Sequence, residues 1–556
     1  MRNEITEVSP FKIFAYILLP CFLIPIPSVG GSGFSIPHNA IVLVAVGISL
    51  MFMVVHKNIK TSSFFVPLFI LAFFAFLPAT WNNSEISTAA LRLFFVIVTL
   101  FWVFLLPDFE TKLGQNRMLA TILLLIVLQA IYGLIQYFVL IPFEFLFASK
   151  GFRIGGVFLQ PNVLSSFLAT GTIIAGYLLV TDIRSTSTIL SKIALVLLPA
   201  SIYLIQSKTG ALGVILGIVV LTLGMLLHKQ NKNILVVLGL FLIGIVLGVL
   251  FQYLDLILFD RSQRGLDSHI TSSNARLAFY MQSVLIIFDN LGGVGFGKFS
   301  YNFLLSWVSD PNEVFGADTL VANLKHPHNE LLFLGVEGGI FTLFIVLIAI
   351  LLVFISASKN NPRNTFYLKL SLLLPISVHV MLEYPFYHSF IHWVLFLLFI
   401  RLFISNRSSM PISKLYVGSV GLLLTIFSIT GSWTVVKLNE FRRAPSSGGQ
   451  ALTLIVNPWV QKADLDYAIQ VTSLNSANQI GIEDMVRAEL IGAYEVLETM
   501  PEVNLLLKMI QSHILLGETK EAVRLLELIN TVYLRQLGRE GHELTVSEFT
   551  LPNNKN

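Results

Sequence analysis

A short polar segment, Lys325-His326-Pro327-His328-Asn329-Glu330, concentrates groups that can move a proton. A histidine acts as a general base or as a hydrogen-bond donor near neutral pH, and a neighbouring carboxylate can orient it. Glu337 follows inside an apolar run, where a carboxylate is costly enough to require a partner or a role. The segment therefore predicts either an acid–base site or a structural polar cap with Glu337 paired to another helix.

Other segments carry groups suited to an anion. Gly292 to Lys298 (GGVGFGK) could present backbone N–H groups to a phosphate, although its spacing is not that of a P-loop and a turn is the simpler interpretation. Ser207-Lys208-Thr209-Gly210 contains the K-T-G triplet of penicillin-binding proteins without an S-x-x-K partner, so we treat that match as accidental.

Metal ligation is the weaker hypothesis. His326 and His328 with Glu330, or Glu383 with His388 and His392, could be assembled into ligand sets. Neither set matches a zinc motif such as H-E-x-x-H. We therefore expect no metal and no cofactor.

The elements that must position these groups are membrane helices. Of the 556 residues, 55% are hydrophobic and 12% charged, which excludes a soluble globular protein. Runs long enough to cross a bilayer, about 17 to 25 residues, predict an all-α polytopic membrane protein with about 13 transmembrane helices, near 11–28, 39–56, 63–79, 87–107, 118–141, 161–181, 189–206, 210–227, 233–253, 331–357, 366–381, 389–405 and 415–436.

The orientation follows from the loop cations, which accumulate on the cytoplasmic side. Alternate connections carry them, for example Lys112 with Arg117 and Arg184 with Lys192. This pattern predicts a cytoplasmic N-terminus, and an odd number of spans places residues 437–556 on the other side. Ser28 to Phe34 offers no A-x-A-like cleavage site, so we expect the first run to remain as a span.

Eight cations oppose this pattern on the outer side. They are Lys150, Arg153, Lys208, Arg261, Arg264, Arg276, Lys298 and Lys325. A long outer loop tolerates charge, which is the simpler explanation. The cations fall into only three segments, however, 141–160, 206–210 and 254–329, and this grouping favours an anion site on the outer face. Within the loop 254–329, Ala275 to Asp289 has helical spacing after the capping residues Ser272 to Asn274. We expect an interfacial or re-entrant helix with Arg276 in its first turn.

The chain divides into a basic membrane domain, residues 1–436, and an acidic C-terminal domain, residues 437–556, with eleven cations against fifteen anions. Apolar residues at three and four spacing predict helices over 484–498, 505–516 and 521–533. The pair around Gly517 resembles one tetratricopeptide-like hairpin, and a generic helical domain is equally compatible.

Three segments together carry a resemblance to a known family: Arg153 to Asn162 (RIGGVFLQPN), Lys325 to Glu330 with the following Glu-Gly-Gly, and Glu383-Tyr384-Pro385. They resemble the bacterial O-oligosaccharyltransferases, or pilin glycosylation ligases, which belong with the O-antigen ligases and polymerases. The similarity in arrangement covers essentially the whole chain.

The resemblance implies transfer of a preassembled glycan from polyprenyl (undecaprenyl) diphosphate to a Ser or Thr hydroxyl of a periplasmic, pilin-like protein, at the bacterial inner membrane. It implies catalytic roles for His328, Arg276 and Glu330. Diphosphate or glycan contacts are implied for Arg153, Gln160, Asn162, Lys208, Lys298, His326 and Tyr384. Lys208 departs from the arginine that ligases of this superfamily tend to show, keeping the charge without the forked geometry.

Three alternatives stay open. An O-antigen polymerase or a lipid A-core ligase would share the spans and cations and differ in its acceptor. A lipid-linked glycan transporter would need repeats and ionisable groups near the bilayer midplane, which the sequence does not favour. No nucleic-acid partner is expected.

Overall fold

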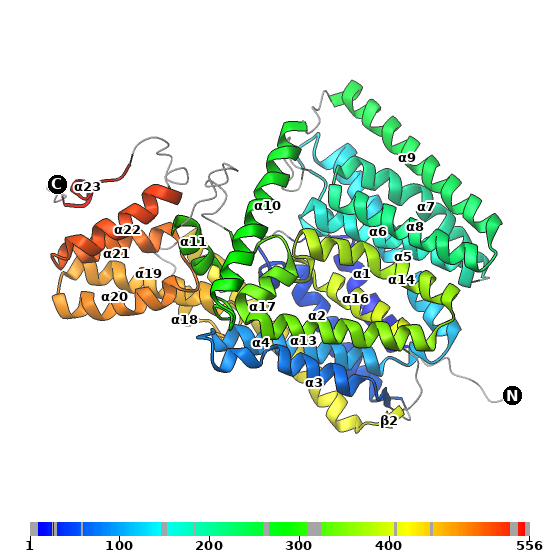
Figure 1. The fold of residues 1–556 in the computed structure, drawn as a ribbon, viewed down its shortest axis with the longest axis horizontal. Coiled ribbons are helices and arrows are strands. Elements are labelled where there is room, and N and C mark those ends of the chain that lie inside the picture. Colours follow the sequence, from blue (N-terminus) through cyan, green and yellow to red (C-terminus); the bar gives the residue numbers. More distant parts are fainter. Residues whose placement is uncertain are drawn as a thin grey trace. The chain divides into compact units, whose positions relative to one another are not determined.

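The structure, a computed structural model, describes residues 9–24, 26, 31–56, 59–145, 153–182, 184–259, 266–309, 324–404, 409–444, 449–533 and 543–550. Lys150, Arg261 and Arg264 lie outside these described residues. Within them the chain is nearly all helical (Figure 1), which confirms the predicted all-α membrane architecture.

Each of the thirteen apolar runs forms a helix. In the described part of the chain, nine helices are long and apolar enough to cross a membrane: α4 (Ile86–Leu105), α5 (Lys112–Ile135) with a π-helical extension (Gln136–Leu140), α6 (Pro161–Thr181), α7 (Ser185–Ile205), α8 (Lys208–Leu227), α9 (Asn231–Phe259), α13 (Glu330–Asn360), α14 (Arg363–Leu382) and α17 (Lys414–Arg443). The other four runs form shorter apolar helices: α1 (Pro10–Cys21), α2 (Pro37–Met53), α3 (Phe65–Ala75) with η2 (Leu77–Thr80), and α16 (Phe390–Phe403).

The chain forms two compact units, each assembled from separate stretches. Unit 1 takes residues 1–72, 94–264 and 346–432, and unit 2 takes residues 73–93, 265–345 and 433–556. Short elements complete them: η1 (Gly33–Ser35), η3 (Pro107–Phe109), η5 (Gly156–Phe158) and α15 (Pro385–His388) in unit 1, and α11 (Phe299–Ser309), α18 (Gly449–Thr453) and α23 (Ser547–Thr550) in unit 2.

The centre of unit 1 is α6, whose residues from Val163 to Leu178 are all buried. Helices α5, α7, α8 and α14 pack around it. One face of α8 is lined by glycines, and an added Cβ at Gly217 would collide with Ile173 of α6, and at Gly224 with Leu368 of α14. Small residues of this kind let membrane helices approach closely. The glycine face of α8 therefore allows α6 and α14 to pack close to each other. The polar residues at the ends of these helices then lie close together as well.

Two short strands also join distant parts of unit 1. β1 (Lys60–Ser62) pairs antiparallel with β2 (Ser409–Pro411), with Thr61 opposite Met410. The strands form a two-stranded ribbon between the connection before α3 and the connection before α17.

In unit 2 the C-terminal helices form two hairpins, α19 (Lys462–Ile480) with α20 (Glu483–Leu497) and α21 (Val503–Leu515) with α22 (Thr519–Val532) (Figure 1). The three predicted C-terminal helices are confirmed within two residues. Gly517, with φ +73°, lies in the turn of the second hairpin, a backbone conformation that glycine adopts without strain.

The helix predicted over 275–289 begins earlier than expected. α10 runs from Leu266 to Asp289, so Arg276 lies in the middle of the helix and not in its first turn. Ser272, Ser273 and Asn274 are helical residues here, not caps. Serine and asparagine favour caps only when their side chains compete for backbone groups, and tertiary context overrides that preference.

Candidate functional site

A polar cluster in unit 1 joins the ends of three helices. Asn162, in the first turn of α6, donates from Nδ2 to Oε1 of Glu383 (3.1 Å), the residue that ends α14. The Asn162 Oδ1 accepts from the hydroxyl of Ser207 (2.8 Å), which in turn caps the first turn of α8. One amide therefore fixes segments that are far apart in the sequence, and it places Lys208 and Tyr384, the next residues in each, beside the same cluster.

Arg153 is attached to the same region. Its Nη2 donates to the carbonyl oxygens of Ile205 (2.8 Å) and Gln206 (3.0 Å), at the C-terminal end of α7. Carbonyl oxygens at a helix C-terminus attract a cation through the helix dipole. These two bonds hold the guanidinium next to Ser207.

Gln160 and Tyr384 frame the cluster. Gln160 is the N-cap of α6 and makes no capping bond with its side chain. Tyr384 is buried and stacks on Tyr387 with ring centroids 5.0 Å apart, while the His388 ring lies edge-on at 4.7 Å. Amide and cationic groups can bind phosphate oxygens, and the aromatic stack supplies an apolar wall beside them.

Sequence reasoning named His392 only as a possible metal ligand and missed the buried chain of hydroxyl and imidazole groups to which it belongs, one turn deeper along α6. Ser166 Oγ lies 2.6 Å from His379 Nδ1 and 2.9 Å from His392 Nε2, and His392 Nδ1 lies 2.9 Å from the Ser389 hydroxyl. Ser166, His379 and His392 are all fully buried. The signal was available, because histidines inside apolar runs are rare and mark either function or specific pairing.

In unit 2, His328 packs against α10. Its ring stacks on Phe279 with centroids 6.1 Å apart, and its carbonyl oxygen accepts from the hydroxyl of Tyr280 (2.9 Å). Arg276 lies one turn before Tyr280 on the same helix, so α10 carries Arg276 and holds His328. Two of the residues expected to act in catalysis are thus positioned by one element.

The Lys325–Glu330 segment is sharply bent. His328 has φ +57°, a left-handed conformation that is uncommon outside glycine, and its N–H donates to Nδ1 of His326 (3.2 Å). The two imidazole rings lie 4.6 Å apart. Asn329 then caps α13 by accepting from the N–H of Leu332 (3.0 Å), and Glu330, buried, opens that helix. The strained backbone directs His328 and His326 toward each other.

Glu337 has a structural partner in Arg92 of α4. The two side chains form an ion pair within unit 2, and the carboxylate also accepts from the N–H of Gly297 (2.8 Å). Sequence reasoning did not use Arg92, which also lies in an apolar run. Opposite charges within two membrane spans predict that the two side chains pair. Of the two interpretations of Glu337, the contacts favour pairing to another helix.

The glycine-rich segment crosses α13 at its kink. Gly339 has φ +71°. A Cβ on Gly339 would collide with the backbone of the glycine-rich segment, and a Cβ on Gly293 would collide with the backbone of α13. Lys298, at the end of the segment, pairs with Glu498, whose Oε2 lies 2.5 Å from its Nζ. The segment is a close backbone crossing, and the Lys298 charge has a carboxylate partner.

The ten expected site residues therefore fall into two sets. Unit 1 holds Arg153, Gln160, Asn162, Lys208 and Tyr384, and unit 2 holds Arg276, Lys298, His326, His328 and Glu330. In the part of the chain that the structure describes, no three His, Cys, Asp or Glu side chains are grouped to hold a metal ion.

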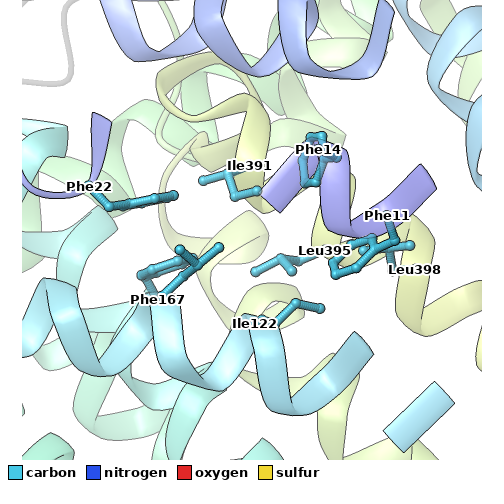
Figure 2. A pocket seen from close by; sticks show the side chains of 9 residues that line it. Phe11, Phe14, Phe22, Ile122, Phe167, Ile391, Leu395 and Leu398 are labelled. Atoms are coloured by element: carbon cyan, nitrogen blue, oxygen red, sulfur yellow. The ribbon is translucent and has the colours of Figure 1, made fainter. Parts of the chain in front are cut away.

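Unit 1 also contains a small apolar hollow, lined from α1, α5, α6 and α16 (Figure 2). Phe22 and Phe167 stack at one side of it, with parallel rings 5.7 Å apart. The hollow is lined by Phe11, Phe14, Phe22, Ile122, Leu125, Phe167, Ile391, Leu395 and Leu398. None of these side chains is polar, so the lining offers no group for proton transfer.

Two family models match the chain. Residues 193–347 match the model described as O-antigen ligase, and residues 367–540 match the model described as virulence factor membrane-bound polymerase, C-terminal. No curated protein matches. The two matches support the resemblance stated from the sequence at the level of the O-antigen ligase superfamily.

Proposed function

We propose that the chain transfers a preassembled glycan from a polyprenyl diphosphate to a hydroxyl of an exported protein. The observation that carries the proposal is the gathering, in unit 1, of three segments chosen from sequence for diphosphate and glycan binding. Asn162 bonds both Glu383 and Ser207, and Arg153 bonds the residue before Ser207. The family-model matches support the same type of chemistry.

In the proposed reaction the oxygen of the acceptor hydroxyl attacks the anomeric carbon of the glycan. The bond between that carbon and the diphosphate oxygen breaks, and the diphosphate leaves with the electron pair. Cations placed where this negative charge develops lower the barrier. Arg153 and Arg276 are suited to forked contact with phosphate oxygens, and Lys208, at the N-terminus of α8, adds a point charge beside backbone N–H groups.

The hydroxyl proton has to leave as the new bond forms. We assign its removal to His328, with His326 and Glu330 assigned to orient the imidazole. The backbone N–H of His328 donates to Nδ1 of His326, and this bond holds the two rings 4.6 Å apart. Gln160, Asn162 and Tyr384 are assigned to glycan or diphosphate oxygens. Lys298 would contribute only after release from Glu498.

A polymerase is the second candidate, because residues 367–540 match a model described as a membrane-bound polymerase. It would use the same donor and a hydroxyl of a second glycan. The difference lies in the acceptor alone, so an experiment that varies the acceptor separates the two.

The test is the intact mass of a pilin co-expressed with the chain in cells that make a lipid-linked oligosaccharide. We expect a glycan-sized mass gain with the unmodified chain, and a loss of about 100-fold or more with His328→Ala, the usual scale for a general base. No gain on the pilin, together with lengthened lipid-linked glycans, would identify the polymerase instead.

A further inference from the structure

Three large apolar side chains are exposed close together after α17. Leu454, Val456 and Trp459 have 53%, 65% and 53% of their surface exposed. We call these three residues the apolar edge. Single exposed apolar residues are ordinary, whereas a group of this size on one short stretch indicates an interaction surface.

The stretch is fixed from its other side. Leu452 and Ile455 pack against a core cluster that includes Leu438 and Phe441 of α17 and Leu465 of α19. The alternation of inward and outward side chains leaves the apolar edge pointing away from this cluster. Its exposure is therefore set by a packed scaffold.

Hydrogen bonds tie the same stretch to α17. The indole N–H of Trp433 donates to the carbonyl oxygen of Leu454 (3.0 Å). The Thr434 hydroxyl donates to the carbonyl oxygen of Asn457 (3.0 Å) and accepts from the Asn457 N–H (3.3 Å). The backbone on which the apolar edge stands thus lies at the level of residues 433 and 434.

That level is the carboxyl end of a membrane span. The apolar run of α17 is 415–436, which at about 1.5 Å per residue covers the hydrocarbon core. Trp433 is half exposed near its end, where tryptophan is enriched at the membrane interface. Lys437 lies over the Trp433 ring at 4.6 Å, and Arg442 and Arg443 follow, so the helix becomes charged just beyond.

We propose that the apolar edge inserts Leu454, Val456 and Trp459 into the lipid interface beside the end of α17 and anchors the beginning of the C-terminal helices to the bilayer. A lipid surface is the occupant that the observations favour, because the stretch is hydrogen-bonded to the end of a span, at the half-exposed Trp433. Apolar chains with an aromatic member at this depth are typical of interfacial anchors. This inference is independent of the glycan-transfer proposal.

The experiment places an environment-sensitive fluorophore on Val456→Cys in a Cys21→Ser background, which leaves one cysteine in the chain. The labelled full chain is reconstituted into liposomes without any acceptor protein, using lipids that carry a nitroxide near the headgroup. We expect the label to lose most of its fluorescence to the lipid nitroxide and to be shielded from iodide. Ile491→Cys on α20, which is 66% exposed, gives the reference for a label on the same unit away from a span.

A label at position 456 that iodide reaches freely and the lipid nitroxide does not quench would overturn the proposal. Shielding that appears only when an acceptor protein is added would also overturn it, by making the edge a protein-docking surface. Leu454→Cys provides a second reporter if Val456→Cys fails to fold, as judged by size-exclusion chromatography.

Discussion

Asn162 and Glu383 are 221 residues apart in the sequence, and the amide of one donates to the buried carboxylate of the other across 3.1 Å. The same amide accepts from Ser207, so it is the common partner of α6, α8 and the end of α14. Its position makes it the residue on which the geometry of the unit 1 cluster depends most directly.

Asn162→Ala should lower the rate of glycan transfer by about tenfold or more while leaving expression intact. The substitution removes a partner from both Ser207 and Glu383, and a buried polar group left unpaired costs about 1 to 3 kcal/mol. The measurement is transfer from a synthetic polyprenyl diphosphate glycan in reconstituted vesicles. Asn233→Ala is the matched control, since Asn233 bonds Leu179 at the opposite end of α6. Equal rates in the two variants would remove Asn162 from the site.

Ser166→Ala should destabilise unit 1, whereas Ser165→Ala should not. Ser166 Oγ bonds two buried imidazoles, but the buried Ser165 Oγ has no hydrogen-bond partner among the described residues. Loss of the Ser166 hydroxyl leaves the buried imidazole nitrogen atoms without this hydrogen-bond partner, which is destabilising. Loss of the Ser165 hydroxyl breaks no hydrogen bond and removes a polar group that is buried at a free-energy cost. The measurement is the apparent unfolding temperature in detergent, by loss of the monodisperse size-exclusion peak. A larger fall for Ser165→Ala would contradict the assigned network.

Arg92→Met and Glu337→Leu should each destabilise the chain by about 3 to 5 kcal/mol, and the double variant by much less. Removing one member of a buried ion pair leaves an uncompensated charge, while replacing both leaves apolar groups. A double-mutant cycle on the same unfolding measurement checks this. Additive losses would show that the two side chains do not depend on each other.

The hairpin of α21 and α22 should lose stability in acid. Hydrogen bonds from Arg487, and also His513, lower the pKa of the Glu518 carboxyl below its ordinary value. A depressed pKa in the folded state stabilises the fold above the unfolded value of about 4.3, and that contribution is lost as the pH falls through the folded pKa. Hydrogen exchange of residues 505–532 in the full chain, corrected for intrinsic rates, should show protection that falls as the pH is lowered below the unfolded value. Glu518→Gln should remove this part of the pH dependence, and an unchanged profile in that variant would refute it.

The fold was predictable because bilayer-length apolar runs have few alternatives to a helix. A helix lies in each of the thirteen runs, and the helices around Gly517 lie where their spacing placed them. The start of α10 was not predictable, because Ser272 to Asn274 are compatible with a cap and with a helix interior. Whether these residues end up in a cap or in a helix depends on what α10 packs against, and the local sequence does not show that.

The candidate site was predictable segment by segment but not pair by pair. Lys208 was selected as a cation that opposes the charge pattern, and Asn162 and Tyr384 as what the family resemblance implies. That Asn162 bonds both Glu383 and Ser207 follows from which spans lie side by side. The glycine face of α8 decides that arrangement by permitting close approach of α6 and α14. Such packing depends on shapes of side chains distributed along whole helices, and a single sequence does not display it.

The ribbon of β1 and β2 links two connections that ten apolar runs separate in the sequence. With the ribbon outside the bilayer, the pairing of Thr61 with Met410 requires both connections to share one side, and the number of crossings between them is then even. Ten of the apolar runs, from 63–79 to 389–405, separate the two strands. Among the described helices between the strands, eight are long and apolar enough to cross a membrane, α4 to α9, α13 and α14. Ten and eight are both even, so the ribbon is compatible with either number of crossings.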